Sequence, residues 1–164
     1  MNPTMNRLPS PVSFRPAEER ELPTIARWMR QAADLPLEQQ KVILQGLIYL
    51  FKDPNEAWRP TARVMEAGGK PALIVEMIAG ELHMTARAGI ARNDRLLLCA
   101  WGKVLEYIFF TEGQPGVQIL IPLFRRKDFG VLERLGCWRQ ENCTDKHMTY
   151  RRYVCRPEDL RIPG

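Results

Sequence analysis

A helix pattern between two strand patterns lies at the centre of the chain and limits the folds open to it. From residue 93 to about residue 111 there is no proline, and apolar residues recur at three- and four-residue spacing. This predicts a long amphipathic helix, whose start Asn93 or Asp94 could cap. The run 117–124 is almost continuously apolar, which is typical of a strand buried on both faces. The strands before and after the helix are therefore expected to be neighbours that run parallel.

The segment before this helix has the pattern of an antiparallel meander. Strands are predicted over residues 61–66, 72–78 and 81–88. Gly68 and Gly69 predict a tight turn between the first two strands, and residues 79–80 predict a second turn. Alternation of apolar and polar residues in the third strand indicates that one of its faces is buried.

Further helices and strands complete the predicted order. In chain order they are a strand at 13–15, helices at 18–33 and 37–51, a short helix at 128–135 stopped by Gly136, and closing strands at 138–144 and 148–155. The order is thus β, α, α, β, β, β, α, β, α, β, β. It predicts an α/β fold of the α+β kind: a mixed, mostly antiparallel central sheet with one parallel crossover pair and helices on both faces.

The chain has 164 residues, of which 45% are hydrophobic and 26% charged, enough for a single domain with one core. Residues 1–11 contain three prolines and no periodicity, so we expect a flexible N-terminal arm and a single domain over residues 12–164. No apolar run approaches the ~18 residues of a membrane helix, and the first residues lack a secretory signal pattern. We therefore expect a soluble, cytoplasmic protein.

Lysine and arginine outnumber aspartate and glutamate by 24 to 19, which gives a net charge of +5. This mild excess suits an anionic small molecule such as a nucleotide phosphate at least as well as DNA. It is also common on an ordinary solvated surface. The basic stretches 125–127 and 151–152 keep nucleic-acid binding open as the last-ranked alternative.

The four cysteines are expected to be free thiols, as is usual in an intracellular chain; they are Cys99, Cys137, Cys143 and Cys155. The last three lie near His147 in the sequence and are potential zinc ligands. Their spacing lacks the C-x-x-C pair that holds two thiolates on one turn, so we expect no metal site.

Four segments occur in an order that resembles the GNAT N-acetyltransferase superfamily. They are FRPA at 14–17 before an acidic helix, EAGGKPALIV at 66–75, the long helix after the fourth strand, and VLERLG at 131–136. The resemblance covers nearly the whole chain. It implies the family's opening strand and first helix, its second hairpin, its long helix and its terminal helix-to-strand junction at these places.

The resemblance implies an acyl-coenzyme A site where the fourth strand ends, at the family pattern Gln/Arg-x-x-Gly-x-Gly/Ala. Backbone N–H groups and a helix N-terminus there would bind the coenzyme pyrophosphate. The corresponding residues read ARAGIA at 86–91, in which Gly89 and Ala91 match and Ala86 replaces the first position. The resemblance thereby implies that acetyl-CoA, the co-substrate, is bound by Arg87, Ala88, Gly89, Ile90, Ala91, Arg92 and Arg95.

The resemblance also implies an amine acceptor, which must be neutral to attack the thioester. A carboxylate, often through water, would remove its proton. Glu81 at the start of the fourth strand is the first candidate for this base, and Glu76 on the preceding strand is the second. His83 has a suitable intrinsic pKa and shares a strand face with Glu81. Tyr150 in the last strand could stand in as the general acid.

Three positions depart from the family pattern. The tyrosine that often protonates the departing thiolate is Leu132 here. An asparagine found earlier in that region is replaced near Arg125, and Cys137 stands where a phenylalanine is common.

The sequence thus predicts an acyl-CoA-dependent N-acyltransferase, with acetyl transfer to an amine acceptor of unknown identity. The alternative is a catalytically inactive GNAT-like module that acts in binding or assembly through protein or nucleic-acid contacts. A membrane partner is not expected. A homodimer stays open, because the late strands of such folds often pair between subunits.

Overall fold

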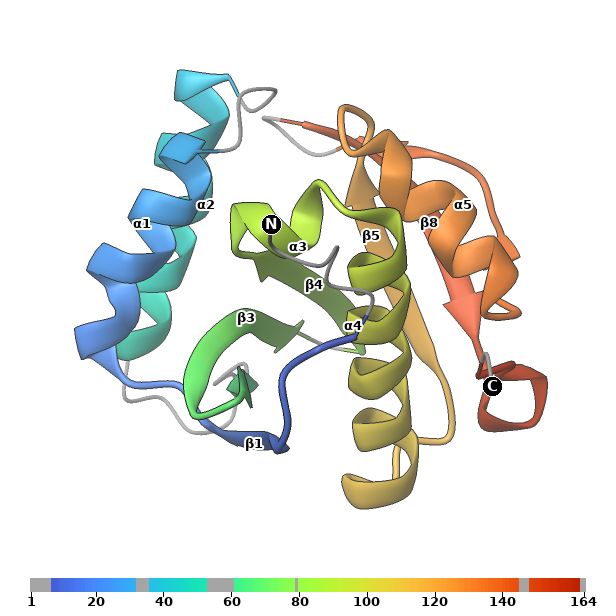
Figure 1. The fold of residues 1–164 in the computed structure, drawn as a ribbon. Coiled ribbons are helices and arrows are strands. Elements are labelled where there is room, and N and C mark those ends of the chain that lie inside the picture. Colours follow the sequence, from blue (N-terminus) through green and yellow to red (C-terminus); the bar gives the residue numbers. More distant parts are fainter. Residues whose placement is uncertain (1–6, 32–35, 53–60, 79, 145–147, 163–164) are drawn as a thin grey trace.

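Helices lie on both sides of a twisted sheet in the computed structural model of the chain (Figure 1). The structure describes residues 7–31, 36–52, 61–78, 80–144 and 148–162. The strands are β1 (Val12–Pro16), β2 (Thr61–Ala67), β3 (Lys70–Ile78), β4 (Glu81–Ala86), β5 (Val117–Pro122), β6 (Trp138–Arg139), β7 (Cys143–Thr144) and β8 (Thr149–Cys155). The α-helices are α1 (Leu22–Gln31), α2 (Leu37–Lys52), α3 (Ala88–Ala91), α4 (Asp94–Glu106) and α5 (Arg126–Arg134), and 3-10 turns lie at Glu19–Glu21 and Pro157–Asp159.

The strands form one eight-stranded sheet in the order β1-β2-β3-β4-β5-β8-β6, with β7 also paired to β8. All the pairs are antiparallel except β4 with β5, which run parallel. The parallel pair is the crossover that the sequence predicts, because the chain must return through α4 to start β5 in the same direction. The predicted fold class is confirmed.

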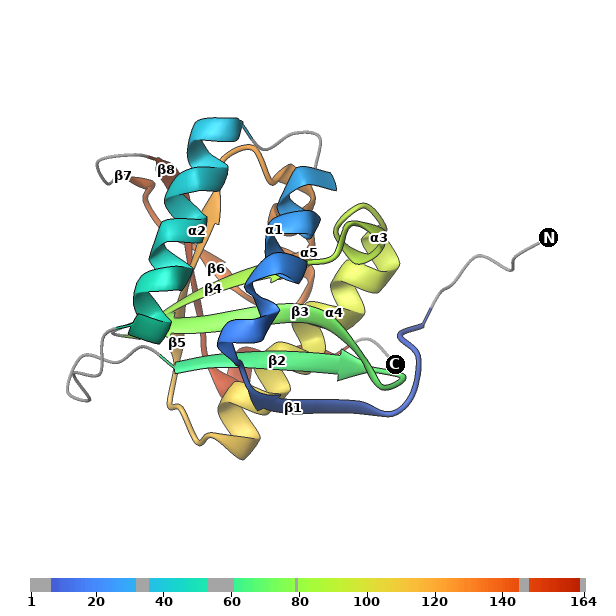
Figure 2. The same ribbon diagram turned by 90° about the vertical axis from the view of Figure 1, so that its left-hand side faces the viewer.

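The two faces of the sheet are covered by different helices. On one face, Ile25, Trp28 and Met29 of α1 pack against Val64 and Ile74 of the sheet. Figure 2 shows α1 and α2 together in front of this face, which we call the α1–α2 face. The larger core lies on the opposite face of the sheet, where α4 and α5 pack on the strands. We call this the α4–α5 face. Successive residues of a strand point to opposite faces, so this division fixes the side to which each strand residue points.

The long helix begins as predicted. The Asn93 side-chain oxygen accepts hydrogen bonds from the backbone N–H groups of Arg95 and Leu96, both at 3.1 Å, and so caps α4. After α4 the chain continues through one π-helical turn, Tyr107–Thr111, so the helical region ends where the sequence pattern ends.

Two predicted strands are shorter in the structure. The strand expected at 81–88 ends at Ala86, because Ala88–Ala91 form the short helix α3. A helix of four residues is too short to produce a periodic pattern in the sequence. The strand expected at 138–144 is divided into β6 and β7, with exposed residues 140–142 between them.

Part of the predicted N-terminal arm contacts the domain. Leu8 packs against the larger core, and the Gly68 N–H donates to the Pro11 carbonyl at 2.9 Å. Residues 1–6 lie outside the described residues, as do Ala79 of the second predicted turn and His147.

Gly136 ends α5 in the left-handed conformation, with φ +93°, as its place after the helix predicts. A Cβ at this position would lie 2.0 Å from the carbonyl oxygen of Asp159. We expect Gly136→Ala to lower the free energy of unfolding by more than about 1 kcal/mol, measured by urea denaturation. Gly130, inside α5, is the matched control, since a Cβ there meets no atom within 4 Å. Gly130→Ala should raise stability by up to about 1 kcal/mol, and a loss at Gly130 equal to that at Gly136 would contradict this account.

Candidate functional site

The parallel strands β4 and β5 are paired over only two positions, Glu81 with Gln118 and Leu82 with Ile119. Beyond them β4 stays paired with β3 as far as Ala86, while β5 stays paired with β8 as far as Pro122 (Figure 1). The main chains therefore separate toward their carboxyl ends, and we call this the β4–β5 divergence. Separations of this kind, at the carboxyl ends of parallel strands, are places where ligands commonly bind.

Three of the four predicted catalytic residues meet beside this divergence, on the α1–α2 face. Glu76 of β3 lies directly opposite His83 of β4, so their side chains point to the same face. His83 is the first residue of β4 beyond the positions paired with β5. Its ring makes an edge-to-face contact with Tyr150 of β8, at 5.9 Å between centroids. We call these residues the Glu76–His83–Tyr150 cluster.

Burial raises the pKa of Glu76 from 4.5 to about 7, because removal from water disfavours the charged carboxylate. Near neutral pH this group is therefore divided between its acid and carboxylate forms. A side chain in that condition can both accept and return a proton.

Glu81 lies farther from the cluster. It shares a face of β4 with His83, as predicted, because both are at half-buried positions of the strand's alternating pattern. However, it lies at the paired end of β4, opposite Ile78 on one side and Gln118 on the other. The structure therefore places Glu76, rather than Glu81, directly across from His83.

An arginine spans the same divergence on the α4–α5 face. The Arg125 guanidinium donates to the main-chain carbonyl of Met84 on β4 and, at 2.6 Å, to the Asp128 carboxylate of α5. Asp128 is 3% exposed and also accepts a hydrogen bond from the Trp101 indole N–H at 2.9 Å. This Met84–Arg125–Asp128–Trp101 network joins β4 to the start of α5 and to α4.

Sequence reasoning missed this network. It identifies Arg125 only as a replaced position and Asp128 only as the start of a helix. The three-residue spacing allows an ion pair on one turn. Nothing in the sequence indicates that the guanidinium reaches a carbonyl 41 residues away along the chain.

Leu132, at the family's tyrosine position, is fully buried in the larger core. Its side chain offers no hydroxyl group to a departing thiolate. Leu132 belongs to α5. Tyr150 lies on the opposite face of the sheet from α5, because it is paired with Pro122 and contacts His83.

Five of the seven predicted phosphate-binding residues, 87–91, form α3 and the position before it. The N–H groups of Ile90 and Ala91 both donate to the Arg87 carbonyl at 3.0 Å. The amides of Ala88 and Gly89 are the first of the helix and, as at any helix start, have no carbonyl one turn earlier to bond to. Gly89 is exposed, and a Cβ there would meet no atom within 4 Å, so the space in front of this turn is open.

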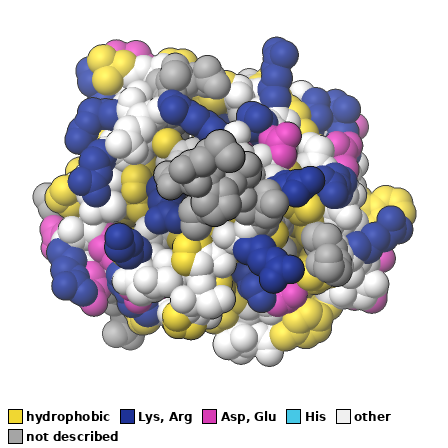
Figure 3. Space-filling model, viewed as in Figure 1, with side chains coloured by type: hydrophobic (Ala, Val, Ile, Leu, Met, Phe, Trp, Pro, Cys, Tyr) yellow, Lys and Arg dark blue, Asp and Glu magenta, His cyan; other side chains and the backbone are white. Residues whose placement is uncertain are grey.

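Three arginines lie close to this turn in the sequence: one precedes α3, one follows it, and one lies in the first turn of α4. Arg87 is half-buried, whereas Arg92 and Arg95 are exposed. The Arg92 guanidinium donates to the Gln31 carbonyl at the end of α1. Figure 3 shows Lys and Arg side chains spread across this side of the molecule. Open space, amides at a helix start and guanidinium groups together fit an anionic ligand, although the first amides of α4 are already bonded to Asn93.

The basic stretches considered for nucleic acid make contacts within the protein. Lys127 pairs with Asp94 at 3.0 Å, and the Arg151 guanidinium lies 3.9 Å from the centre of the Phe129 ring. Arg125 belongs to the network described above. Three of the five cations in these stretches therefore already contact groups within the protein.

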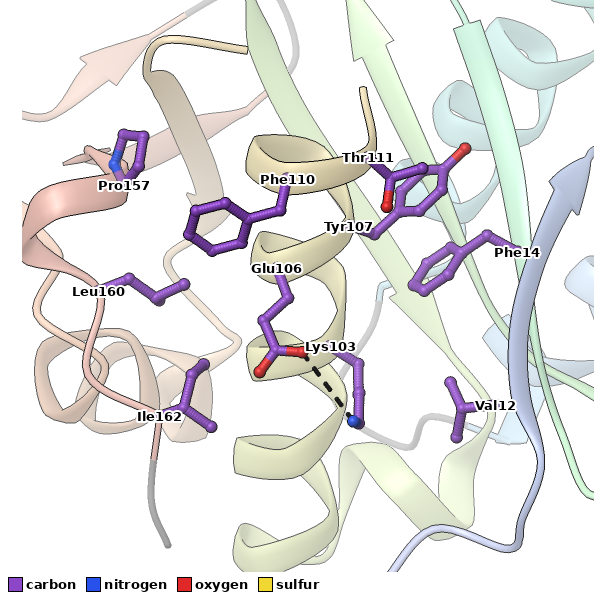
Figure 4. Close-up of a pocket in the computed structure, with 10 residues that line it drawn as sticks. All are labelled: Val12, Phe14, Lys103, Glu106, Tyr107, Phe110, Thr111, Pro157, Leu160 and Ile162. Atoms are coloured by element: carbon purple, nitrogen blue, oxygen red, sulfur yellow. Dashed lines mark ion pairs between the residues drawn. The ribbon is translucent and has the colours of Figure 1, made fainter. Parts of the chain in front are cut away.

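A separate apolar cavity of about 450 Å³ lies between β1, the end of α4 and the C-terminal segment (Figure 4). Phe14 and Tyr107 stack at 4.1 Å between ring centroids on one side of it. Lys103 and Glu106 form an ion pair of 3.9 Å in its wall. The cavity contains none of the predicted site residues.

Within the described part of the chain, no helix is long and apolar enough to cross a membrane. In the same residues, no three His, Cys, Asp or Glu side chains are grouped to hold a metal ion.

Comparison with known proteins supports the fold. No family model and no curated protein matches the sequence. Among solved structures, the chain is similar to an aminoglycoside N(6′)-acetyltransferase from Legionella pneumophila, with a TM-score of 0.72 and 12% identity over 91% of this chain and 94% of that one. It is also similar to a chimera of the spermidine N-acetyltransferase SpeG from Vibrio cholerae and hSSAT (TM-score 0.66, 13% identity, 90% and 96% covered). A putative acetyltransferase gives a TM-score of 0.64 at 17% identity, with 90% and 84% covered. The chain therefore has the GNAT acetyltransferase fold.

We expect Asp128→Ala to lower the free energy of unfolding by about 3–5 kcal/mol, because it leaves the Arg125 charge without its partner and removes the acceptor of the Trp101 N–H. Thermal or urea denaturation measures this loss. Asp94→Ala is the control, since the Asp94–Lys127 pair is exposed and should contribute less than about 1 kcal/mol. Similar losses for the two variants would show that the network does not stabilise the fold.

Proposed function

We propose that this protein is an N-acyltransferase that moves an acyl group, expected to be acetyl, from acyl-coenzyme A to an amine. The observation that carries the proposal is the Glu76–His83–Tyr150 cluster beside the β4–β5 divergence. The fold shared with acetyltransferases supports it by analogy.

Acyl-coenzyme A has two features that this chain could bind. Its phosphates would lie at α3, against the amides of Ala88 and Gly89 and the three arginines close to them in the sequence. Its extended arm carries two amides, and could pair with the main chain of β4 where β5 has separated, as an added strand pairs with a sheet edge. The Met84 carbonyl there is bound by Arg125, so we expect this guanidinium to move aside when the arm binds.

The reaction needs a base on the acceptor side. The amine nitrogen forms a bond to the thioester carbonyl carbon, the carbon–sulfur bond breaks, and the nitrogen loses a proton. In our proposal Glu76 accepts that proton, directly or through water, because its raised pKa suits proton exchange near neutral pH. His83, directly opposite, would orient the amine or the water. Glu81 is the alternative base on the same face.

The leaving thiolate needs a proton donor. With Leu132 in the core, the Tyr150 hydroxyl is the candidate that remains from the sequence, since its ring contacts His83 beside the divergence. Backbone N–H groups of β4 would polarise the thioester carbonyl in such an arrangement.

Glu76→Gln tests the base. We expect it to lower kcat/KM by about 10²–10⁴-fold in an assay of thiol release from acetyl-CoA, with spermidine and an aminoglycoside as amine probes. In the unchanged protein the rate should rise as the pH increases through about 7, because the carboxylate form is the base. Glu81→Gln is the matched control and should keep most of the activity. Loss in Glu81→Gln alone would move the role of base to Glu81.

The same variant separates catalysis from unfolding. Because burial raises the pKa of Glu76, its ionisation weakens the folded state as the pH rises from 4.5 to about 7. Glu76→Gln removes this cost, so above pH 7 it should be more stable by an amount on the order of 3 kcal/mol. The difference should shrink toward pH 4.5. An inactive variant that is also less stable would show damage to the fold instead of loss of a base.

Gly89→Glu tests the phosphate site. A carboxylate in the open space before α3 would repel the coenzyme phosphates, so calorimetric affinity for acetyl-CoA should fall at least about tenfold. Gln140→Glu makes the same change of charge at an exposed position beside β6 and should leave the affinity unchanged. Equal affinity for Gly89→Glu and the unchanged protein would exclude this site.

A binding module without catalysis is the second candidate. Two observations favour it: Leu132 provides no acid, and Asn93 takes the first amides of α4. A folded protein that does not bind millimolar acetyl-CoA would support this candidate over the enzyme.

A further inference from the structure

Two cysteines far apart in the sequence face each other at the end of the β6–β8 ladder. Trp138 is paired with Val154, and the Gln140 N–H donates to the Arg152 carbonyl at 2.8 Å. Hydrogen-bonded and non-hydrogen-bonded pairs alternate along an antiparallel ladder. Counting back three pairs from Gln140 and Arg152 therefore places Cys137 and Cys155 at a non-hydrogen-bonded position, directly after the Trp138–Val154 pair. Side chains at such positions approach each other most closely.

Both thiols are buried, and they contact each other. Cys137 is 7% exposed and Cys155 is fully buried. A hydrogen bond joins the two sulfur groups; together with burial it raises the pKa of the Cys137 thiol. The same hydrogen bond lowers the pKa of Cys155. The Cys155 S–H also donates to the Arg156 carbonyl, at 3.9 Å from Sγ to oxygen.

A small cavity gives access to one member of the pair. It has a volume of about 280 Å³, and Cys137 lies in its wall beside Gly136 and Trp138. Three carboxylates, those of Glu133, Glu158 and Asp159, also line this cavity, whereas Arg161 is the one cation among the described residues of its lining. The negative charge favours a neutral reactant over an anionic one.

We propose that Cys137 and Cys155 form a redox-active pair that neutral hydroperoxides convert to an intramolecular disulfide. The Cys137 sulfur attacks one peroxide oxygen, the O–O bond breaks, and the S–H proton of Cys137 passes to the leaving oxygen, so that the thiol becomes a sulfenic acid while water or an alcohol leaves. The Cys155 sulfur then attacks the sulfenic sulfur, the S–S bond forms, and a second water leaves with the Cys155 proton. The peroxide is reduced and the two thiols are oxidised.

The disulfide would join the end of α5 to β8. It would close a loop that contains both short strands β6 and β7, and so restrict the unfolded chain. The site is independent of the proposed acyl transfer, because it contains none of the residues assigned to that reaction.

The experiment is oxidation of the full chain by hydrogen peroxide, followed by alkylation in denaturant and peptide mass spectrometry. We expect a peptide that links Cys137 to Cys155 and lacks two hydrogens, and a Tm higher by about 5 °C or more. Cys99 and Cys143, which are half-buried, should remain alkylatable at low peroxide. Oxidised glutathione, which is anionic, should form the disulfide at least about tenfold more slowly than peroxide at equal concentration.

Two variants keep the test decisive. Cys143→Ala should form the disulfide as the unchanged protein does, whereas Cys155→Ala should not, and its Cys137 should stop at sulfenic or sulfinic acid. If Cys155→Ala fails to fold, the linked peptide in the unchanged protein decides the matter. Links that involve Cys99 or Cys143, or thiols at 137 and 155 that stay reduced after the others are oxidised, would overturn the proposal.

Discussion

The brief parallel pairing of β4 and β5 is the constraint on which the rest of the structure depends. The two strands share a direction only because α4 returns the chain across the sheet, and they stay together for two residue pairs. Each then follows its antiparallel partner, β3 or β8. A main-chain separation inside a sheet leaves carbonyl and N–H groups without their usual partners, and buried groups of this kind must be satisfied in another way.

The structure meets that requirement for the Met84 carbonyl, and it places different side chains on the two faces of the separation. On the α4–α5 face, Arg125 binds the Met84 carbonyl and is itself neutralised by Asp128. On the α1–α2 face, His83 and Tyr150 contact each other from strands on either side of the separation. Buried polar groups are costly unless they are paired, and both sets lie where β4 and β5 separate. Glu76, with its raised pKa, belongs to the same place and gives it a group that can exchange protons.

Much of the fold could be predicted because the relevant signals are local. The Asn93 cap, the Gly136 stop and the apolar run of β5 each express a preference of a few neighbouring residues, and each appears where expected. Helix α3 could not be predicted, because one turn of helix has no periodicity to detect. The contacts of Leu8 and Pro11 with the domain could not be predicted from the sequence either, since they depend on where the Gly68 turn lies in space.

For the candidate site, the sequence by itself determined which chemical groups are present: two carboxylates and an imidazole on consecutive predicted strands, a phenol on the last predicted strand, and a glycine between arginines. The tertiary structure alone decided their arrangement. Strand register placed Glu76 opposite His83, and burial, which is a property of the whole packed domain, set the pKa of Glu76. Likewise the ladder of β6 and β8 brought Cys137 to Cys155, because pairing between strands joins residues that no local pattern connects.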